Sequence, residues 1–312
     1  MTQDETKPRD ADPNSVLSSA ASALQGELAK PLREGLYLVS TPIGNLADMS
    51  LRALGVLARA DLIFCEDTRH SRKLLGHYGI SGELHAYHEH NAARERPRII
   101  ERIRAGQSVA LISDAGTPLI SDPGHKLVRE AREAGFKVHA IPGASAVLAA
   151  LTSSGLPTDR FFFEGFLPPK TVARRKRLEE LTDIPATLVF YEAPQRLAAM
   201  LVDVSEVLGN RQGAVAKELT KLHEGFSLGT LQDLAAGSVE ELGERGEFVV
   251  LAGPAPPSEV SDEDIQARLE AALKETSFRD GVQDVSHMLG VPRKRVYQLA
   301  LALKDKDGEG GE

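Results

Sequence analysis

Short apolar runs alternate along this chain with longer segments in which apolar residues recur every three or four positions. The short runs are typical of buried strands, and the periodic segments are typical of amphipathic helices. In the first half of the chain this pattern predicts strands at 36–40, 62–65, 84–87, 108–111 and 137–141. Helices are predicted between them, at 51–60, 94–105 and 125–135. The alternation is typical of an α/β domain whose mainly parallel sheet is covered by helices on both faces.

The same alternation begins again near residue 161. It predicts strands at 161–163, 187–191, 214–218 and 247–252, with helices at 171–181 and 195–208. A stretch rich in proline and glycine follows, and its composition is that of a linker. Beyond the linker, two short helical patterns meet at Gly290, which resembles a helix-turn-helix. A small packing or dimerisation module fits the same pattern.

These patterns divide the chain into six parts. We predict a disordered tail over 1–34, an α/β domain over 35–145 and a second α/β domain over 146–253. A linker over 254–260, a helix-turn-helix-like unit over 261–304 and a disordered end over 305–312 complete the chain. With 42% hydrophobic residues, the chain has enough apolar material to bury full cores.

Composition narrows the classes of protein to be considered. The formal net charge of −8 argues against a generally basic nucleic-acid coat, but it leaves room for a local basic patch. Because Cys65 is the only cysteine, an intramolecular disulfide is excluded and a zinc site built from cysteines is disfavoured. No apolar run is long enough to predict a transmembrane helix, and the first residues lack the apolar core of a signal peptide. We therefore expect a cytoplasmic protein.

Histidines cluster in one place, at His85, His88 and His90. Neither a cysteine nor a following acidic cluster accompanies them, although such residues would complete a typical metal site. We expect these histidines to lie on the surface or to face a substrate, and we predict no metal centre.

A loop over 112–124 has the composition of a binding loop rather than of a simple connector. It joins a predicted strand to a predicted helix and contains two glycines, two prolines, two serines, and the acidic residues Asp114 and Asp122. Glycine permits unusual backbone conformations and proline stiffens the chain, so the loop should be shaped and rigid. Open α/β sheets bind ligands at the carboxyl ends of their strands. A small polar ligand is the favoured occupant, while ordinary turn chemistry with Asp122 as a helix cap is the alternative.

Charged residues follow three other predicted strands. Asp67 and Arg69 follow the strand at 62–65, Glu192 follows the strand at 187–191, and the third group lies at 217–221. We expect Asp67 to cap the next helix or to orient Arg69, and we expect the three strand ends to meet in one polar cleft. Basic side chains that fit contacts with phosphate groups lie near the first of these strand ends, around the predicted helix at 171–181 and in the tail: Arg72, Lys73, Lys170, Arg174, Arg175, Lys176, Arg177, Arg293, Lys294 and Arg295. Solvated helix faces are the alternative for all of them.

Several of these segments together resemble a known family. The motifs at 40–46, 66–69, 113–124, 142–146, 163–168 and 190–194 resemble those of the bacterial small-subunit ribosomal RNA (cytidine-2′-O)-methyltransferases. That family belongs to the tetrapyrrole methylase superfamily, and the resemblance covers roughly residues 35–253. It implies an α/β, two-domain tetrapyrrole-methylase-like fold with a ligand cleft between the domains and a small C-terminal helical domain. It also implies a homodimer that uses S-adenosylmethionine.

The resemblance also implies which residues hold the cofactor. The loop with Pro42 and Gly44 is expected on the substrate side of the cofactor site. The methionine part of S-adenosylmethionine would be held by residues of the 113–124 loop, namely Asp114, Ala115, Gly116, Ile120 and Ser121. Residues of the 142–146 segment would lie near it, namely Pro142, Gly143, Ser145 and Ala146. From the second domain, Tyr191, Leu219 and Thr220 would close over the adenosine.

The activity implied is methylation of the ribose 2′-hydroxyl of a cytidine in the decoding region of the small ribosomal subunit. The 2′-oxygen must be aligned with the methyl group and must lose its proton, so a nearby base is useful. Asp67 with Arg69, and Glu192, are the candidates for this role. A membrane or DNA partner is not expected.

Two other functions remain open from the sequence. One is a methyltransferase that acts on a tetrapyrrole or another small molecule. The sequence at 113–116 departs from the more compact Gly-Asp-Pro pattern of tetrapyrrole-acting relatives, which weakens that alternative. The other is a non-catalytic RNA-binding assembly factor that retains the fold.

Overall fold

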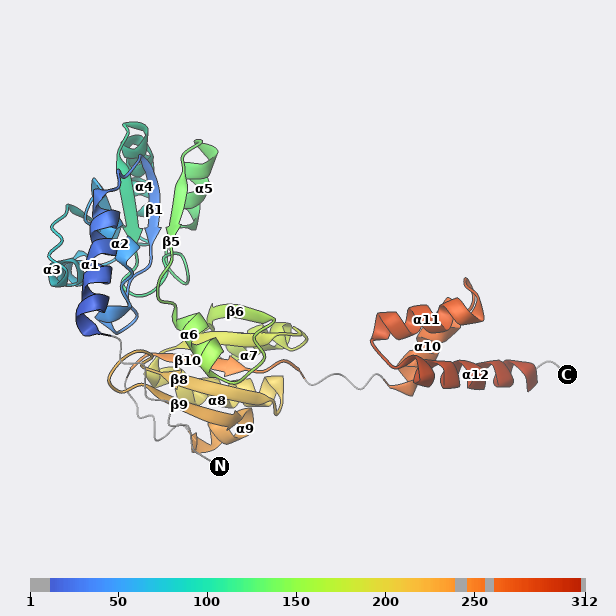
Figure 1. Cartoon of the computed structure of the whole chain (residues 1–312). Coiled ribbons are helices and arrows are strands. Elements are labelled where there is room, and N and C mark those ends of the chain that lie inside the picture. The colour runs from blue at the N-terminus through green and yellow to red at the C-terminus, as the bar shows by residue number, and fades with distance from the viewer. Residues whose placement is uncertain (1–11, 239–245, 256–260, 310–312) are drawn as a thin grey trace, which may run out of the picture. The chain divides into compact units, whose positions relative to one another are not determined.

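The computed structural model describes residues 12–238, 246–255 and 261–309. The chain divides between Ala255 and Pro256 into two compact units, which are treated separately below. Figure 1 shows the elements of each unit.

The first sheet is entirely parallel. Its strands are β1 (Gly35–Val39), β2 (Leu62–Cys65), β3 (Leu84–Ala86), β4 (Ser108–Ile112) and β5 (Val138–Ile141), in the order β3-β2-β4-β1-β5. The helices between them are α2 (Leu51–Leu57), α3 (Thr68–His77), α4 (Ala92–Arg104) and α5 (His125–Glu133). Alternate side chains along β1 enter two cores, with Leu36 packed against α4 and α5 and Tyr37 packed against α2 and α3. This arrangement confirms the predicted parallel sheet with helices on both faces.

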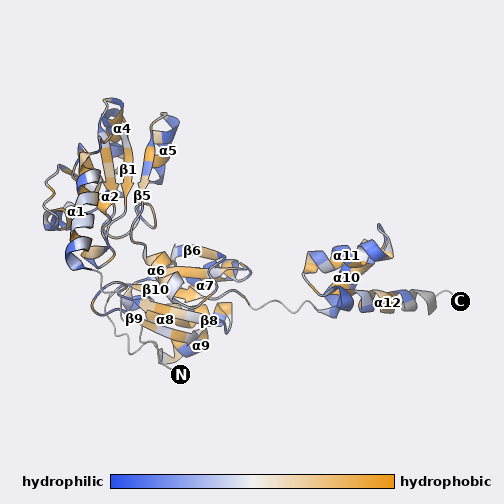
Figure 2. Ribbon diagram, viewed as in Figure 1, coloured by the Kyte–Doolittle hydropathy of each residue, from blue (hydrophilic) through white to orange (hydrophobic). Residues whose placement is uncertain are grey.

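The second sheet is mixed. After α6 (Ala146–Ser153), its elements are β6 (Phe161–Phe166), α7 (Thr171–Leu181), β7 (Thr187–Glu192), α8 (Pro194–Leu208), β8 (Gln212–Lys217), β9 (Gly225–Thr230), α9 (Leu231–Asp233), η2 (Leu234–Ser238) and β10 (Phe248–Ala252). In the order β6-β7-β10-β8-β9, only β6 and β7 pair in parallel. The edge strand β9 is absent from the sequence prediction, because its two glycines and partly exposed side chains weaken the apolar pattern. Hydrophobic colour is concentrated on the strands in Figure 2.

Part of the predicted disordered tail is helical. Residues Pro13–Ala29 form α1, whose first turn is capped by the side chain of Asp12. The helix packs against α2 at Gly55, where a Cβ atom would stand 2.9 Å from the Cβ atom of Glu27. The prediction of disorder is therefore wrong for 13–29, because tertiary packing stabilises a segment whose weak periodicity gave no helical signal. Residues 1–11 lie outside the described part of the chain.

The C-terminal unit contains α10 (Asp262–Ala272), α11 (Phe278–Leu289) and α12 (Arg293–Glu309) around a core that includes Ile265, Val285 and Val296. Gly290, with φ +62°, ends α11 in the left-handed conformation that favours glycine. The predicted pair of helices around this glycine is confirmed. Because α12 continues to Glu309, the prediction of a disordered end is wrong for 305–309. Residues 310–312, and most of the predicted linker, lie outside the described residues.

Within the ranges that the structure describes, no helix is long and apolar enough to cross a membrane.

Candidate cofactor and substrate site

A cavity of about 380 Å³ lies where the loops that follow β1, β4 and β5 meet the second sheet. Its volume falls within the range of about 300–1,000 Å³ that is common for sites that bind small molecules. The wall is formed by Ile43, Asp114, Ala115, Gly116, Thr117, Ile120, Ser121, Asp122, Ser145, Ala146, Phe166, Tyr191, Glu192, Ala193, Pro194, Leu219, Gly246, Glu247, Phe248 and Val249.

The loop after β4 is held rigidly, as its composition predicts. Thr41 and Gly116 exchange two main-chain hydrogen bonds, with N–O distances of 2.9 and 3.1 Å. The buried Ser113 hydroxyl donates to the carbonyl oxygen of Gly116 at 3.0 Å, and the Thr117 hydroxyl donates to the carbonyl oxygen of Ala144 at 3.2 Å. The loop is therefore fixed to its neighbours before any ligand binds.

Backbone strain flanks two residues of the cavity wall. Leu119 and Ser121, on either side of Ile120, have φ values of +74° and +65°. Glu218 and Thr220 have φ values of +49° and +67° and flank Leu219, another residue of the wall. Residues other than glycine adopt this conformation at a cost of about 1–3 kcal/mol each, and such strain is concentrated at functional sites. The shape of the cavity is thus maintained against local conformational preference.

Most of the residues assigned to cofactor binding by family resemblance line this cavity. They are Asp114, Ala115, Gly116, Ile120, Ser121, Ser145, Ala146, Tyr191 and Leu219.

The other five residues of that set support the wall instead of forming it. The Thr220 hydroxyl accepts the Asn45 N–H at 3.1 Å, and a Cβ atom on Gly44 would stand 2.4 Å from Lys221 Cγ. The loop that contains Pro42 and Gly44 therefore contacts the 218–221 segment directly. Gly143, beside Pro142, packs against Ser40, whose Cβ atom would be 2.8 Å from a Cβ atom on the glycine.

The structure does not bring Asp67 and Arg69 into the cavity wall. One Asp67 carboxylate oxygen accepts the Arg69 N–H at 2.8 Å and caps α3, and the other accepts from the Arg69 guanidinium at 3.0 Å. The bond to the Arg69 side chain is the main cause that lowers the pKa of Asp67 to about 2. The capping and pairing predictions are confirmed. A carboxylate of such low pKa is a weak base, and Asp67 lies outside the wall, so both observations count against a role as proton acceptor.

Glu192 contributes to the cavity wall, but its side chain is buried. Successive residues of β7 point to opposite faces of the sheet, and Tyr191 occupies the face that packs on α6. The Glu192 side chain is fully buried on the other face, where one oxygen accepts the Ala193 N–H at 2.8 Å and the other lies 3.1 Å from Arg196 Nη2. Burial raises the pKa of Glu192. Its burial and its contacts with Ala193 and Arg196 count against a catalytic role for this side chain, and strand alternation was the signal in the sequence for its placement.

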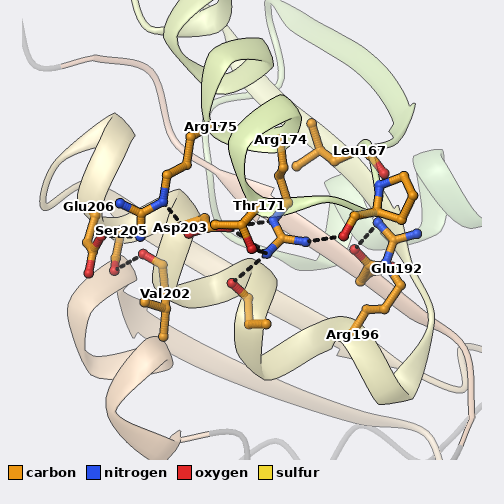
Figure 3. A network of polar contacts seen from close by, with 12 residues as sticks. Leu167, Thr171, Arg174, Arg175, Glu192, Arg196, Val202, Asp203, Ser205 and Glu206 are labelled. Carbon is orange, nitrogen blue, oxygen red and sulfur yellow. Dashed lines mark hydrogen bonds and ion pairs between the residues drawn. The ribbon is translucent and has the colours of Figure 1, made fainter.

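Most of the basic cluster on α7 is already paired. Arg174 is 3% exposed and shares the buried Asp203 with Arg175, whose guanidinium also contacts Glu206 (Figure 3). Arg177 makes a two-pronged pair with Glu164, at 2.6 and 2.7 Å. The buried Arg174 cannot contact phosphate, so that prediction is wrong. Acidic neighbours partly neutralise Arg175 and Arg177, and most of these partners are not visible from the sequence because they lie 13 or more positions away.

The remaining predicted cations differ in exposure and pairing. Arg72, Lys73, Lys170, Lys176, Arg293 and Lys294 are all exposed side chains. Arg295 pairs with Asp262 at 2.6 Å, which joins α12 to α10. Among the described residues, including the three histidines at 85–90, no three His, Cys, Asp or Glu side chains lie together so that they could hold a metal ion.

Asp122 is the titratable residue of the cavity whose role the sequence left undecided. Partial burial and the nearby charge of Glu66 raise its pKa to about 6, against the effect of a hydrogen bond with Ser113. Burial and the charge of Asp122 together raise the pKa of Tyr191 to about 12. The sequence shows an aspartate within a rigid loop, but it does not show that this side chain lines a cavity.

Comparisons with known proteins agree on the family. Residues 35–235 match the family described as tetrapyrrole (corrin/porphyrin) methylases, and residues 259–304 match the RsmI C-terminal HTH domain. Ribosomal RNA small subunit methyltransferase I of Mesorhizobium japonicum is 50% identical, with coverage of 90% of this chain and 96% of the relative. The protein of the same description from Xylella fastidiosa is 47% identical, with coverage of 84% and 97%.

One solved structure with the same fold is uroporphyrin-III C-methyl transferase from Thermus thermophilus, complexed with S-adenyl homocysteine. It aligns with a TM-score of 0.50 at 21% identity, over 70% of this chain and 97% of that chain. The parallel sheet, the mixed sheet and the helical unit thus have matched counterparts. The chain belongs to the tetrapyrrole (corrin/porphyrin) methylase family and, within it, to the group of ribosomal RNA small subunit methyltransferase I proteins.

Proposed function

We propose that this enzyme transfers a methyl group from S-adenosylmethionine to the ribose 2′-hydroxyl of a cytidine in the decoding region of small-subunit ribosomal RNA. The observation that carries the proposal is the cavity enclosed by two strained loops in a chain that is 50% identical to a ribosomal RNA small subunit methyltransferase I. The cytidine and its 2′-oxygen come from the family resemblance of the motifs.

The cavity suits S-adenosylmethionine in size and in chemistry. Ile43, Leu219 and Val249 provide apolar surface, while the 114–117 loop supplies main-chain groups and the Asp114 carboxylate. Asp114 is itself oriented by the Asp67 N–H, which donates to its Oδ1 atom at 3.1 Å. When bound, S-adenosylmethionine supplies an electrophilic methyl group on a sulfonium. The chain's contribution is to hold the donor and the acceptor in line and to exclude water.

Asp122 is the residue that we propose as proton acceptor for the 2′-hydroxyl. It lines the cavity, and its pKa of about 6 leaves most of it ionised at neutral pH. A base whose pKa lies near the working pH combines availability with proton affinity. This assignment replaces Asp67 and Glu192.

RNA contacts are proposed for the exposed cations Arg72, Lys73, Lys170, Lys176, Arg293 and Lys294. Their charges would be attracted to phosphate groups despite the overall charge of −8. We also propose that the enzyme acts as a homodimer in the cytoplasm on the small ribosomal subunit. Exposed apolar side chains such as Leu222 and Leu228 support self-association. Sedimentation equilibrium would reveal a mass of either one or two chains.

Transfer of tritiated methyl from S-adenosylmethionine to small ribosomal subunits that lack the modification tests the proposed activity. Nuclease digestion should place the label in an alkali-resistant dinucleotide, since 2′-O-methylation blocks alkaline cleavage. Cofactor binding without transfer to RNA would favour a small-molecule methyltransferase, and RNA binding without cofactor binding would favour an assembly factor.

A further inference from the structure

We propose that Phe166, backed by Tyr191, is the platform on which the base of the target nucleotide stacks. This inference deepens the proposed function and rests on it. Phe166 lines the cavity and yet is 56% exposed, whereas most aromatic side chains of the second sheet are largely buried. A side chain with both properties lies at the opening of the cavity. An open aromatic face in this position is suited to a flat heteroaromatic ring.

An irregularity in β6 turns Phe166 toward the cavity. Phe163 pairs with Val189 of β7, but the register then shifts, so that Gly165 pairs with Phe190 and Phe166 pairs with Tyr191. Without this shift, strand alternation would place Phe166 with Phe162 on the face that packs against α7 and α8. Gly165 adopts φ +78° at the shift, a conformation that favours glycine. β-Bulges commonly redirect side chains beside active sites, and this one has that effect.

The rings behind Phe166 are already packed together. Its centroid lies 5.6 Å from that of Tyr191, which in turn lies 4.9 Å from that of Phe163 in an edge-to-face arrangement. Tyr191 is therefore supported on one side and Phe166 on its inner side. The exposed part of the Phe166 ring is therefore available to a further ring.

Arginines hold residues on both sides of Phe166. Arg196 Nη2 donates to the Leu167 carbonyl oxygen at 2.7 Å and lies beside the buried Glu192 (Figure 3). On the other side, Glu164 is held by the two-pronged pair with Arg177. Because these contacts hold the residues next to Phe166 before binding, they lower the ordering cost of stacking.

A nucleotide of the RNA is the occupant that the surroundings favour, rather than the adenine of the cofactor. Phe166 lies at the opening, whereas Tyr191 and Leu219 are farther from solvent. The exposed Lys170 follows at the start of α7, only four residues beyond Phe166. Aromatic rings beside cations are typical of surfaces that bind single-stranded nucleic acid. The target base must be unstacked for its ribose to reach the cavity, and a ring at the opening would receive it.

The test compares three variants of the full-length enzyme with small ribosomal subunits as substrate. In Phe166→Leu the platform is lost, in Phe166→Tyr it is retained, and Phe161→Leu is the matched control. Phe161 lies on the same strand, is 44% exposed and does not line the cavity. We expect Phe166→Leu to lower kcat/KM for the subunit roughly 5- to 150-fold, with most of the activity kept in the other two. S-adenosylmethionine affinity, measured by calorimetry, should be unchanged in all three.

The outcomes separate this inference from the proposed function. An unchanged kcat/KM in Phe166→Leu would overturn the stacking role, as would an equal loss in Phe161→Leu. A matching loss of S-adenosylmethionine affinity would show that the ring stacks on adenine instead. If the unmodified enzyme itself fails to methylate the subunit while it binds cofactor, the proposed function is wrong, whatever the variants do.

Discussion

At the scale of single residues, the electrostatics of Asp122 govern the proposed chemistry. Its carboxyl group is partly removed from water and faces the negative charge of Glu66, so its pKa rises from 3.8 to about 6. Behind it lies a second cavity of about 10 Å³, which is also lined by Glu66, Tyr87 and Ser113. That volume is close to the minimum that a water molecule requires. Asp122 thus lines both the larger cavity and a water-sized space.

The first prediction concerns the pH dependence of methyl transfer. Protonated Asp122 cannot accept a proton, so single-turnover rates should fall as the pH drops through about 6. Replacement of Glu66 by Gln removes a negative charge, which lowers the pKa of Asp122 and should shift this fall to lower pH. Asp122→Asn should reduce the rate by about 10²- to 10⁴-fold. A pH series on the three proteins checks these expectations, with Asp67→Asn as the control that keeps its rate.

The second prediction separates loss of chemistry from loss of fold. The folded pKa of Asp122 lies above its unfolded value, so its ionised form opposes folding at neutral pH, and stability should rise as the pH falls from about 7 toward 4. Asp122→Asn should therefore be slightly more stable at pH 7.5, by roughly 1 kcal/mol after allowance for solvent screening, or about 2–4 °C in Tm. A thermal scan in which this variant melts well below the unmodified enzyme would assign its lost activity to misfolding.

At the scale of elements, most of the functional geometry comes from how helices and strands are joined. The α7 helix is joined to α8 by the buried Arg174–Asp203 pair, and this pairing withdraws a cation that the sequence assigned to RNA. The α1 helix lies on α2 through a close approach at Gly55. In both cases a contact between elements determines what the residue does.

The third prediction compares two neighbouring cations of α7. Arg174→Met should destabilise the enzyme by about 3 kcal/mol or more, because it leaves the buried Asp203 with a single partner. Lys176→Met should change stability by no more than about 0.5 kcal/mol, since Lys176 is exposed, yet it should weaken binding to the ribosomal subunit. Urea unfolding and binding assays measure the two effects. Equal stability of the two variants would contradict the structural role given to Arg174.

The fourth prediction concerns the contact between α1 and α2. In Gly55→Ala the new Cβ atom would meet Glu27 at 2.9 Å, so α1 should shift or detach and its amides should exchange faster. Gly76→Ala on α3 is the matched control, since a Cβ atom there has no neighbour within 4 Å. That variant should gain up to about 1 kcal/mol from helix propensity. Hydrogen exchange over Pro13–Ala29 that is unchanged in Gly55→Ala would show that α1 does not depend on this contact.

At the scale of the whole molecule, the chain forms two compact units with different features. The larger unit contains both sheets and the cavity, and the smaller one contains the helix-turn-helix-like arrangement. Within the smaller unit, Arg293 and Lys294 are exposed at the start of α12, while Arg295 stabilises the unit through Asp262. Charge on this unit should therefore affect affinity for RNA and leave the chemistry in the cavity intact.

The fifth prediction tests that division. The double variant Arg293→Glu, Lys294→Glu should lower affinity for the small subunit and reduce the salt dependence of log K by about 2, one unit for each lost phosphate contact. The cofactor affinity should stay the same. Arg268→Glu, Lys274→Glu carries the same charge change on exposed positions of this unit outside α12 and serves as control. Equal effects of the two double variants would indicate general repulsion instead of a contact by α12.

Much of the fold was readable from the sequence, for a local reason. The period of the apolar residues indicates strands and helices, so β2 was predicted residue for residue and most other elements within a few positions. Edge strand β9 and helix α1 were missed because neither has a strong apolar pattern. The rigid loop after β4 was also recognised, since glycine and proline constrain the backbone wherever they occur.

By itself, then, the sequence determined the order of elements, the family and the binding loop, all of which depend on neighbouring residues. Only the tertiary structure decided which charged groups are free to act. Asp67 caps its own helix, the Glu192 side chain is buried beside Arg196, and Arg174 is paired with a residue 29 positions away. The direction and partners of a side chain depend on contacts between distant segments, such as the bond between Asn45 and Thr220, 175 residues apart. Such contacts exist only after the chain has folded.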